Sequence, residues 1–464
     1  MTGAPAQSQS WLALLWDSAE TTQEERQLVF KLDKTLLIFT SLGYFVKRLD
    51  EKNITNAFFA GMKEDLNMYG NELVHANSFY NAGRDQRQLC YVLGQIPSTI
   101  LLTRKPPRLV MPTLVLAWGM ATLATYSVRN MQTLYTLRFL VGLSEAGFYP
   151  GVNYMFGSWY TSRELAKRTT IVLAMGNAGI MLSGFLQTAA YHHLHGVWEL
   201  AGWRWLMILD ATATLPIALF GFAFMPNLPW SPTPSFVLNT QDIELARARM
   251  NPTGRKEDEP WTKVKLQRIL SGWRFWILPL GYVLFINGQV ATPMQYWLKS
   301  FNVEPYPVPG KRFSLTQIQL LMPVPVTAFY VFASFVQACI SDGPAKGSRW
   351  PFIMGGAIWT IVCNATWLAM PLYTNITAHF VYFYLMTLGA AGSLVLNWMN
   401  EILREDNELR ALCIAWASAL GFLVDGIAPN FVWKTTEFPR ATVGYYYSTS
   451  VSVYSTTILD SYPY

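Results

Sequence analysis

The chain has 464 residues, of which 52% are hydrophobic and only 14% are charged. Soluble globular proteins carry about 25% charged residues, so this composition excludes an ordinary soluble protein and indicates a polytopic membrane protein. The net charge of +6 comes from basic residues in short segments between long apolar runs, a pattern that does not favour nucleic-acid binding.

Apolar runs long enough to cross a bilayer, roughly 17 to 25 residues each, recur along the chain. They predict twelve spanning helices, at 33–58, 74–103, 109–128, 131–157, 169–191, 204–225, 275–298, 314–340, 351–370, 378–400, 410–432 and 443–459. The predicted domains are a cytosolic tail (1–32), a six-helix half (33–225), a cytosolic linker with one or two surface helices (226–274) and a second half (275–464). The expected fold is therefore an all-α membrane protein surrounded by the lipid bilayer.

Basic residues in short loops predict the orientation of the chain, because they favour the cytosolic side. With the N-terminus inside, the loops and linker on that side carry about 17 Lys and Arg, against about 7 on the outer side. This asymmetry predicts that both termini are cytosolic.

Two opposite charges interrupt the fourth predicted span. Arg138 and Glu145 are seven residues apart, so their side chains leave the same face of a helix. Charges at membrane depth rarely face lipid, which predicts that they line an aqueous pathway. Arg138 could bind a carboxylate through two parallel hydrogen bonds, and Glu145 could carry a proton. The alternative is a structural ion pair between two helices.

In the first predicted span, Asp50, Asn53 and Asn56 follow one another at three-residue spacing and should face the interior of the bundle. This pattern is consistent with contact to a substrate (Asn53, Asn56) or a proton (Asp50). The alternative is hydrogen bonding between helices, a frequent use of Asn in membranes.

The second half also contains polar residues within or beside apolar spans. The candidates for substrate contact there are Asn287, Tyr296 and Asn397. Glu401 is expected at the cytosolic mouth, where an ion pair with Arg404 or Arg410 would form a gate. Asp425 lies in the eleventh span and has no assigned role.

The sequence predicts no metal site and no cofactor. His192, His193 and His195 have no carboxylate at a suitable spacing, and the four cysteines are scattered, with three in apolar runs. No nucleophile–base arrangement typical of a membrane enzyme is evident either.

Blocks in both halves carry a resemblance to a known family. They are Leu49–Leu73, Tyr91–Arg104, Arg138–Tyr160, Gly184–Ala211, Met294–Asn302, Arg349–Ile353, Leu394–Ile402 and Ala428–Pro439. These blocks resemble the major facilitator superfamily, specifically the fungal anion:cation symporter group with allantoate, nicotinate, biotin and pantothenate permeases. GMKEDLNMYGNEL and PNFVWKTT are most similar to the pantothenate-permease branch.

The resemblance implies two pseudo-symmetric six-helix halves around a central cavity, in a monomer that imports a small organic anion with a proton across the plasma membrane. It implies pantothenate as the anion and points to the fourth-helix arginine, Arg138, in proton coupling. The open alternatives are symport of allantoate, nicotinate or biotin, a non-transporting receptor-like protein, and a decayed paralogue.

Two segments depart from the family pattern. Residues Arg84–Cys90 place charges in the second span, and their removal would restore the family-like NAGYVLGQIP, which favours a mis-spliced gene as the explanation. The last span is rich in Ser, Thr and Tyr and barely long enough to cross. Either departure could leave the product inactive.

Overall fold

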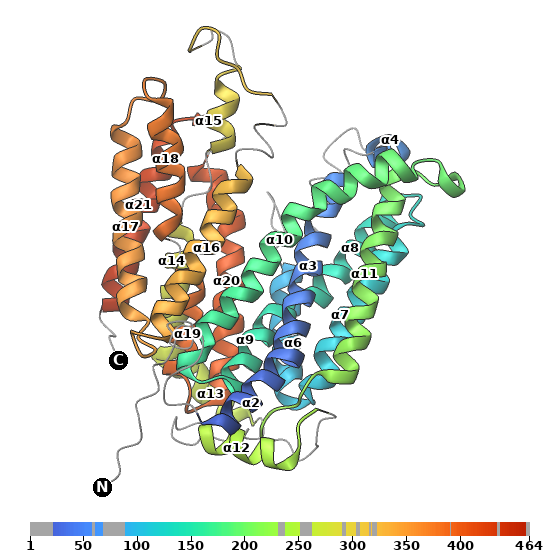
Figure 1. Cartoon of the computed structure of the whole chain (residues 1–464), viewed down its shortest axis with the longest axis vertical. Helices are drawn as coiled ribbons and strands as arrows, with labels where there is room; N and C mark the ends of the chain where they lie inside the picture. Colours follow the sequence, from blue (N-terminus) through green and yellow to red (C-terminus); the bar gives the residue numbers. More distant parts are fainter. Residues whose placement is uncertain are drawn as a thin grey trace.

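The computed structural model describes residues 22–57, 61–67, 89–230, 237–250, 262–289, 294–302, 307–314, 317, 323–389, 391–433 and 437–460. These residues are predominantly helical, and no strand occurs among them (Figure 1). The charged positions Arg84, Asp85 and Arg87 lie outside the described residues. So do the side chains of Asn56 and Asp425.

Helices occur at each of the twelve predicted positions. The first half contains α2 (Gln23–Leu32), η1 (Asp33–Leu37), α3 (Ile38–Ala57), α4 (Lys63–Asp65), α6 (Leu89–Arg104), α7 (Pro107–Thr125), α8 (Met131–Ala146), α9 (Phe148–Trp159), α10 (Ser162–Leu194), η3 (Val197–Glu199) and α11 (Gly202–Phe224). The linker contains α12 (Thr240–Met250) and α13 (Lys263–Ser271). The second half contains α14 (Trp273–Gly288), α15 (Met294–Ser300), α16 (Pro323–Asp342), α17 (Trp350–Ala369), α18 (Ile376–Met386), η6 (Thr387–Gly389), α19 (Gly392–Ile402), α20 (Asn407–Val432) and α21 (Thr442–Asp460).

By length and hydropathy, 6 helices of the described residues could each cross a membrane alone, and the bent pair α13–α14 would be a seventh. Several predicted spans are divided into shorter helices, including the tenth, which is one of the six candidates (Ile376–Ile402). The fourth breaks at Gly147 between α8 and α9, because Pro150 has no N–H to offer the carbonyl of Ala146. The tenth breaks at the 3-10 turn η6, between α18 and α19.

The first span begins earlier than predicted. Thr22 and Glu25 form a capping box that starts α2, and the π-helical turn η1 continues it into α3. The extension places Asp33 beside the start of α10, where its carboxylate binds the Arg168 guanidinium with an Nε–Oδ1 distance of 2.6 Å. The hydroxyl of Tyr160 also donates to Asp33, at 2.9 Å.

Helices pack in pairs within each half, and contacts of α6, α9 and α10 with α16, α19 and α20 join the halves. In the first half α3 packs along α10 and α7 along α11, while α14 packs on α20 and α17 on α21 in the second. The halves meet where α10 contacts α16 and α6 contacts α20. Figure 1 shows α2, α12 and α13 at one end of the molecule, called here the linker end. The two halves lie together at the linker end and diverge towards the opposite end.

Candidate functional site

Two ion pairs link α3 to α8 inside the first half. Lys47 and Asp50 share one face of α3, and Arg138 and Glu145 share one face of α8. The Nζ of Lys47 lies 3.6 Å from Oε2 of Glu145, and Nη2 of Arg138 lies 3.7 Å from Oδ1 of Asp50. None of the four side chains is more than 5% exposed. Arg138 and Glu145 therefore each pair with α3 rather than with each other, and neither meets solvent in this conformation.

A third carboxyl, Asp210 of α11, joins this cluster. The Asn53 amide donates to Oδ2 of Asp210 at 2.7 Å, and the Thr122 hydroxyl of α7 donates to Oδ2 of Asp50 at 3.1 Å. Asp210 was not among the residues predicted from the sequence, although it is the only charged residue between Trp205 and Met225. An isolated acid in an apolar run was the signal that could have found it.

The structure thus brings four of the predicted site residues together, namely Asp50, Asn53, Arg138 and Glu145. The other described candidates lie elsewhere. The amide of Asn287 donates to the Val283 carbonyl of its own helix at 3.0 Å, and the 42% exposed Tyr296 stacks on Phe438 with ring centroids 4.2 Å apart. Asn397 is buried and accepts from the Thr169 hydroxyl at 3.1 Å, which makes it a contact between the halves.

A cluster of tyrosines lies where the two halves meet. The ring centroids of Tyr44 on α3 and Tyr149 on α9 are 5.3 Å apart. Tyr149 packs in one apolar cluster with Tyr282 of α14, and it lies within electrostatic range of Tyr330 of α16. Aromatic side chains from both halves therefore surround the region next to α3, which offers apolar surface together with hydroxyl groups.

The opposite face of α3 from Asp50 carries Arg48. Arg48 forms an ion pair with Glu51 one turn later, and its side chain is 26% exposed. It packs beside Gly176 of α10 and acts electrostatically on Tyr330 of α16. Arg48 was not among the residues predicted from the sequence.

Polar contacts close the linker end. Arg349 binds Oδ1 of Asp342 at 2.6 Å and Oε1 of Glu401 at 3.1 Å, and it donates to the Ser162 carbonyl at the start of α10. Burial opposes the charge of Arg349, but the carboxylates of Asp342 and Glu401 raise its pKa above the usual value. Asp342 also accepts from the backbone N–H of Lys167 at 2.8 Å. The buried Arg349–Asp342 ion pair of the second half therefore binds the backbone at the start of α10, which belongs to the first half.

A second set of contacts joins α20 to α9 at the same end. The Arg410 guanidinium donates to the Gly157 carbonyl at 3.1 Å and to the Ser158 hydroxyl at 2.9 Å. Glu401 was expected to pair with Arg404 or Arg410, and here it pairs with Arg349. Arg404 is exposed in the turn before α20. The region predicted as a gate is thus a contact between the halves, but the cation that pairs with Glu401 is Arg349.

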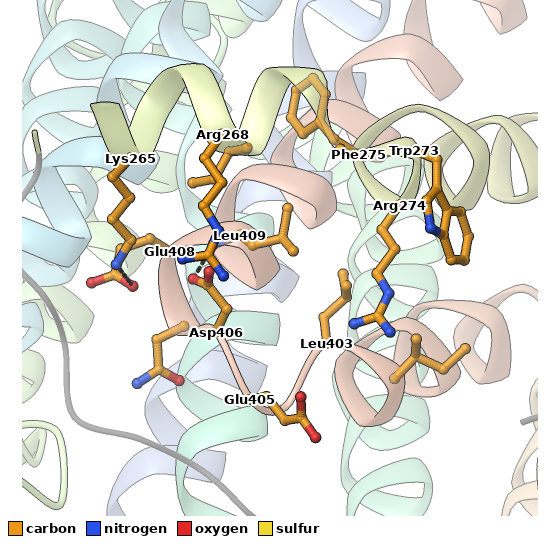
Figure 2. Close-up of a pocket in the computed structure, with 14 residues that line it drawn as sticks. Lys265, Arg268, Trp273, Arg274, Phe275, Leu403, Glu405, Asp406, Glu408 and Leu409 are labelled. Atoms are coloured by element: carbon orange, nitrogen blue, oxygen red, sulfur yellow. Dashed lines mark hydrogen bonds and ion pairs between the residues drawn. The ribbon is translucent and has the colours of Figure 1, made fainter. Parts of the chain in front are cut away.

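A pocket of about 360 Å³ also lies at the linker end. Figure 2 shows Lys265, Arg268 and Arg274 on one side of it and Glu405, Asp406 and Glu408 on the other. The Nζ of Lys265 lies 2.7 Å from Oε2 of Glu408. The pocket is lined by α13, α14 and the α19–α20 turn, so it does not lie between the halves.

Within the described residues no group of His, Cys, Asp or Glu could hold a metal ion. The three cysteines whose side chains are described, Cys339, Cys363 and Cys413, are buried free thiols.

Residues 40–429 match the family described as Major Facilitator Superfamily. The chain is 32% identical to the pantothenate transporter liz1 of Schizosaccharomyces pombe, over 84% of this chain and 72% of the relative. It is 30% identical to the pantothenate transporter FEN2 of Saccharomyces cerevisiae, over 89% of this chain and 81% of the relative. It is 29% identical to the vitamin H transporter of Saccharomyces cerevisiae, over 94% of this chain and 72% of the relative.

Solved structures are similar in fold. The human organic anion transporter MFSD10 aligns with a TM-score of 0.61 at 14% identity, over 95% of this chain and 100% of that one. The proton:xylose symporter XylE aligns with a TM-score of 0.65 at 14% identity, over 95% of this chain and 96% of that one. At this identity the likeness concerns the fold alone.

Proposed function

The chain belongs to the major facilitator superfamily and is a membrane transporter of a small organic substrate, and we propose that it imports a small carboxylate such as pantothenate together with a proton. The family and the relatives are transporters and not enzymes. The proposed location is the plasma membrane with both termini in the cytosol, and the proposed unit is a monomer, since one chain supplies both halves.

The contacts between the halves carry this proposal. Described hydrogen bonds join the start of α10 and the end of α9 in the first half to α16, α17, α19 and α20 in the second. On the side of the second half they involve Asp342, Arg349, Asn397 and Arg410. In alternating access, two halves close one end of the substrate path at a time around a midplane site. If the linker end is cytosolic, this conformation is closed to the cytosol and can load substrate from outside.

Arg48 and Arg138 are the candidates for binding the anion. Arg138 is 0% exposed and faces Asp50, whereas the Arg48 side chain is 26% exposed. A carboxylate can therefore reach Arg48 in this conformation, whereas Arg138 would first have to leave Asp50. We assign the first contact with the anion to Arg48 and keep Arg138 as the cation that responds to protonation.

Asp50 and Glu145 are the proposed proton carriers because each is buried against a cation. Protonation of either carboxylate would weaken its ion pair with Arg138 or Lys47 and so change how α3 is held to α8. A proton that enters with the anion also offsets the anion's charge while both are inside the protein. Asn53 and Asn56 remain proposed contacts on α3, with Asn287, Tyr296 and Asn397 in the second half.

The test is uptake of labelled pantothenate, allantoate, biotin and nicotinate by permease-deficient yeast that expresses the chain with and without residues 84–90. We expect concentrative uptake of pantothenate that stops when a protonophore collapses the proton gradient. Concentrative uptake that survives the protonophore would overturn proton coupling. Uptake of another of the four anions, and not of pantothenate, would overturn the substrate. A protein that reaches the plasma membrane in both forms and transports none of them would overturn the proposal.

A further inference from the structure

Asp50 and Asp210 form a pair of buried carboxyl groups across α3 and α11. Each residue is 1% exposed, and Asp210 accepts a hydrogen bond at 2.7 Å from Asn53, which lies one turn after Asp50 on α3. Two carboxylates that share a site out of water repel strongly, so one of them retains a proton. The pair therefore has the geometry of a shared-proton site.

The hydrogen-bond donors around the pair indicate where the proton lies. Thr122 donates to Oδ2 of Asp50, and Asn53 donates to Oδ2 of Asp210. The Oδ1 atoms of both carboxyls are buried and accept no hydrogen bond from any described residue. Arg138 reaches only one of these atoms, with its Nη2 3.7 Å from Oδ1 of Asp50. A proton held by one of the two carboxyls would supply a donor at a place where these acceptors have none.

The charges around the pair do not compensate it fully. Lys47 from α3 pairs with Glu145 of α8, and Arg138 of α8 pairs with Asp50. Thus three carboxyls face two cations among the described side chains of the cluster. The segments 109–125 of α7, 148–159 of α9 and 169–191 of α10 contribute no Asp, Glu, Lys or Arg. A third negative charge would therefore be buried without a counterion, which is strongly unfavourable.

We propose that Asp50 and Asp210 together form a single-proton site, with Asp210 as the member that holds the proton in the conformation described here. The role of this site in transport rests on the proposed proton symport. Loss of the proton leaves two adjacent carboxylates on α3 and α11, which pushes these helices apart. Because Arg48 lies on the other face of α3, the same movement shifts the cation assigned to the anion.

Asp210→Asn tests the role in transport, because asparagine keeps the shape of the protonated acid but cannot ionise. We expect substrate exchange without a proton gradient to continue. Proton-driven accumulation should fall about tenfold or more, as a typical coupling free energy implies, and the pH dependence of uptake should flatten. Asp242→Asn is the matched control, since Asp242 pairs with Lys31 at the linker end. A wild-type pH profile and accumulation in Asp210→Asn would overturn the proposal.

Infrared spectroscopy of the purified protein tests the proton site independently of transport. We expect a carbonyl band of a protonated carboxylic acid in the wild type that is lost in Asp210→Asn and also in Asp50→Asn, where the remaining acid no longer has a carboxylate beside it and Arg138 has lost its partner. Absence of the band, or its persistence in both variants, would overturn the site. If the band behaves as expected while wild-type uptake ignores the proton gradient, the symport proposal fails and the proton site stands.

Discussion

Arg138 and Asp50 face each other from α8 and α3, with Nη2 and Oδ1 3.7 Å apart and no more than 1% of either side chain exposed. At this depth neither charge can be hydrated once its partner is gone. Removing one member of a buried ion pair destabilises a protein by about 3–5 kcal/mol, much more than losing a surface pair. The pair therefore determines both the packing of the first half and the electrostatics of its interior.

Arg138→Ala should abolish uptake and lower the free energy of unfolding by about 3–5 kcal/mol, because Asp50 is left as a buried charge. The double variant Arg138→Ala/Asp50→Asn should recover most of that stability, and with it the amount at the cell surface, without recovering uptake. Thermal unfolding of the purified proteins and surface labelling measure the two effects. Strictly additive losses of stability in the double variant would show that the two residues are not coupled.

Arg48→Ala should raise the KM for the anion about ten- to hundredfold, the effect of losing a charge-assisted hydrogen bond of about 1.5–3 kcal/mol. Stability should change little, because the side chain is partly exposed. Arg404→Ala is the matched control, since Arg404 is an exposed cation in the turn before α20, away from α3. An unchanged KM in Arg48→Ala, measured by uptake at graded substrate concentrations, would remove Arg48 from the anion site.

Arg349→Ala should open the linker end, because Arg349 holds Asp342 and Glu401 and reaches the Ser162 carbonyl of the other half. The thiol introduced by Ala166→Cys reports the opening, since Ala166 is 0% exposed and its N–H lies 3.3 Å from Oδ1 of Asp342. We expect faster modification of this thiol by a hydrophilic reagent, measured by mass spectrometry. The exposed Arg404→Ala should leave the rate unchanged, and equal rates in both variants would contradict a closing role for Arg349.

The sequence was sufficient to place several helices closely, because hydropathy and helix length act locally, whereas the first and fifth spans begin earlier than predicted. α7, α11, α17, α20 and α21 each begin within about three residues of the prediction, the boundary error expected of such patterns. The break at Gly147 was also readable, because Pro150 lies three residues beyond it. These features depend on short stretches of chain, and no distant contact is needed to produce them.

The partners of the buried charges could not be derived in the same way. Helical periodicity placed Arg138 and Glu145 on one face of α8, but it does not identify the helix that this face meets. Glu401 had several cations within reach of its helix end. Its partner, Arg349, lies 52 residues away, at the start of α17. Tertiary packing decides between such candidates, so the family resemblance indicated which residues matter but not how they pair.

The close packing of α3 on α10 leads to a last prediction, at Gly179. A Cβ at this position would lie 2.3 Å from the Phe45 carbonyl oxygen and 3.3 Å from the Leu49 backbone nitrogen. Backbone atoms of α3 cannot move aside as the end of a flexible side chain can, so Gly179→Ala must push the two helices apart. We expect a loss of about 1–3 kcal/mol, the usual effect of overpacking, measured by thermal unfolding. Gly184→Ala on the same helix is the matched control, because a Cβ there meets no atom within 4 Å.

Since α10 also contacts α16 of the second half, displacement of α3 should also slow uptake per molecule at the cell surface. Equal stabilities of the two variants would show that α3 and α10 do not pack as closely as described.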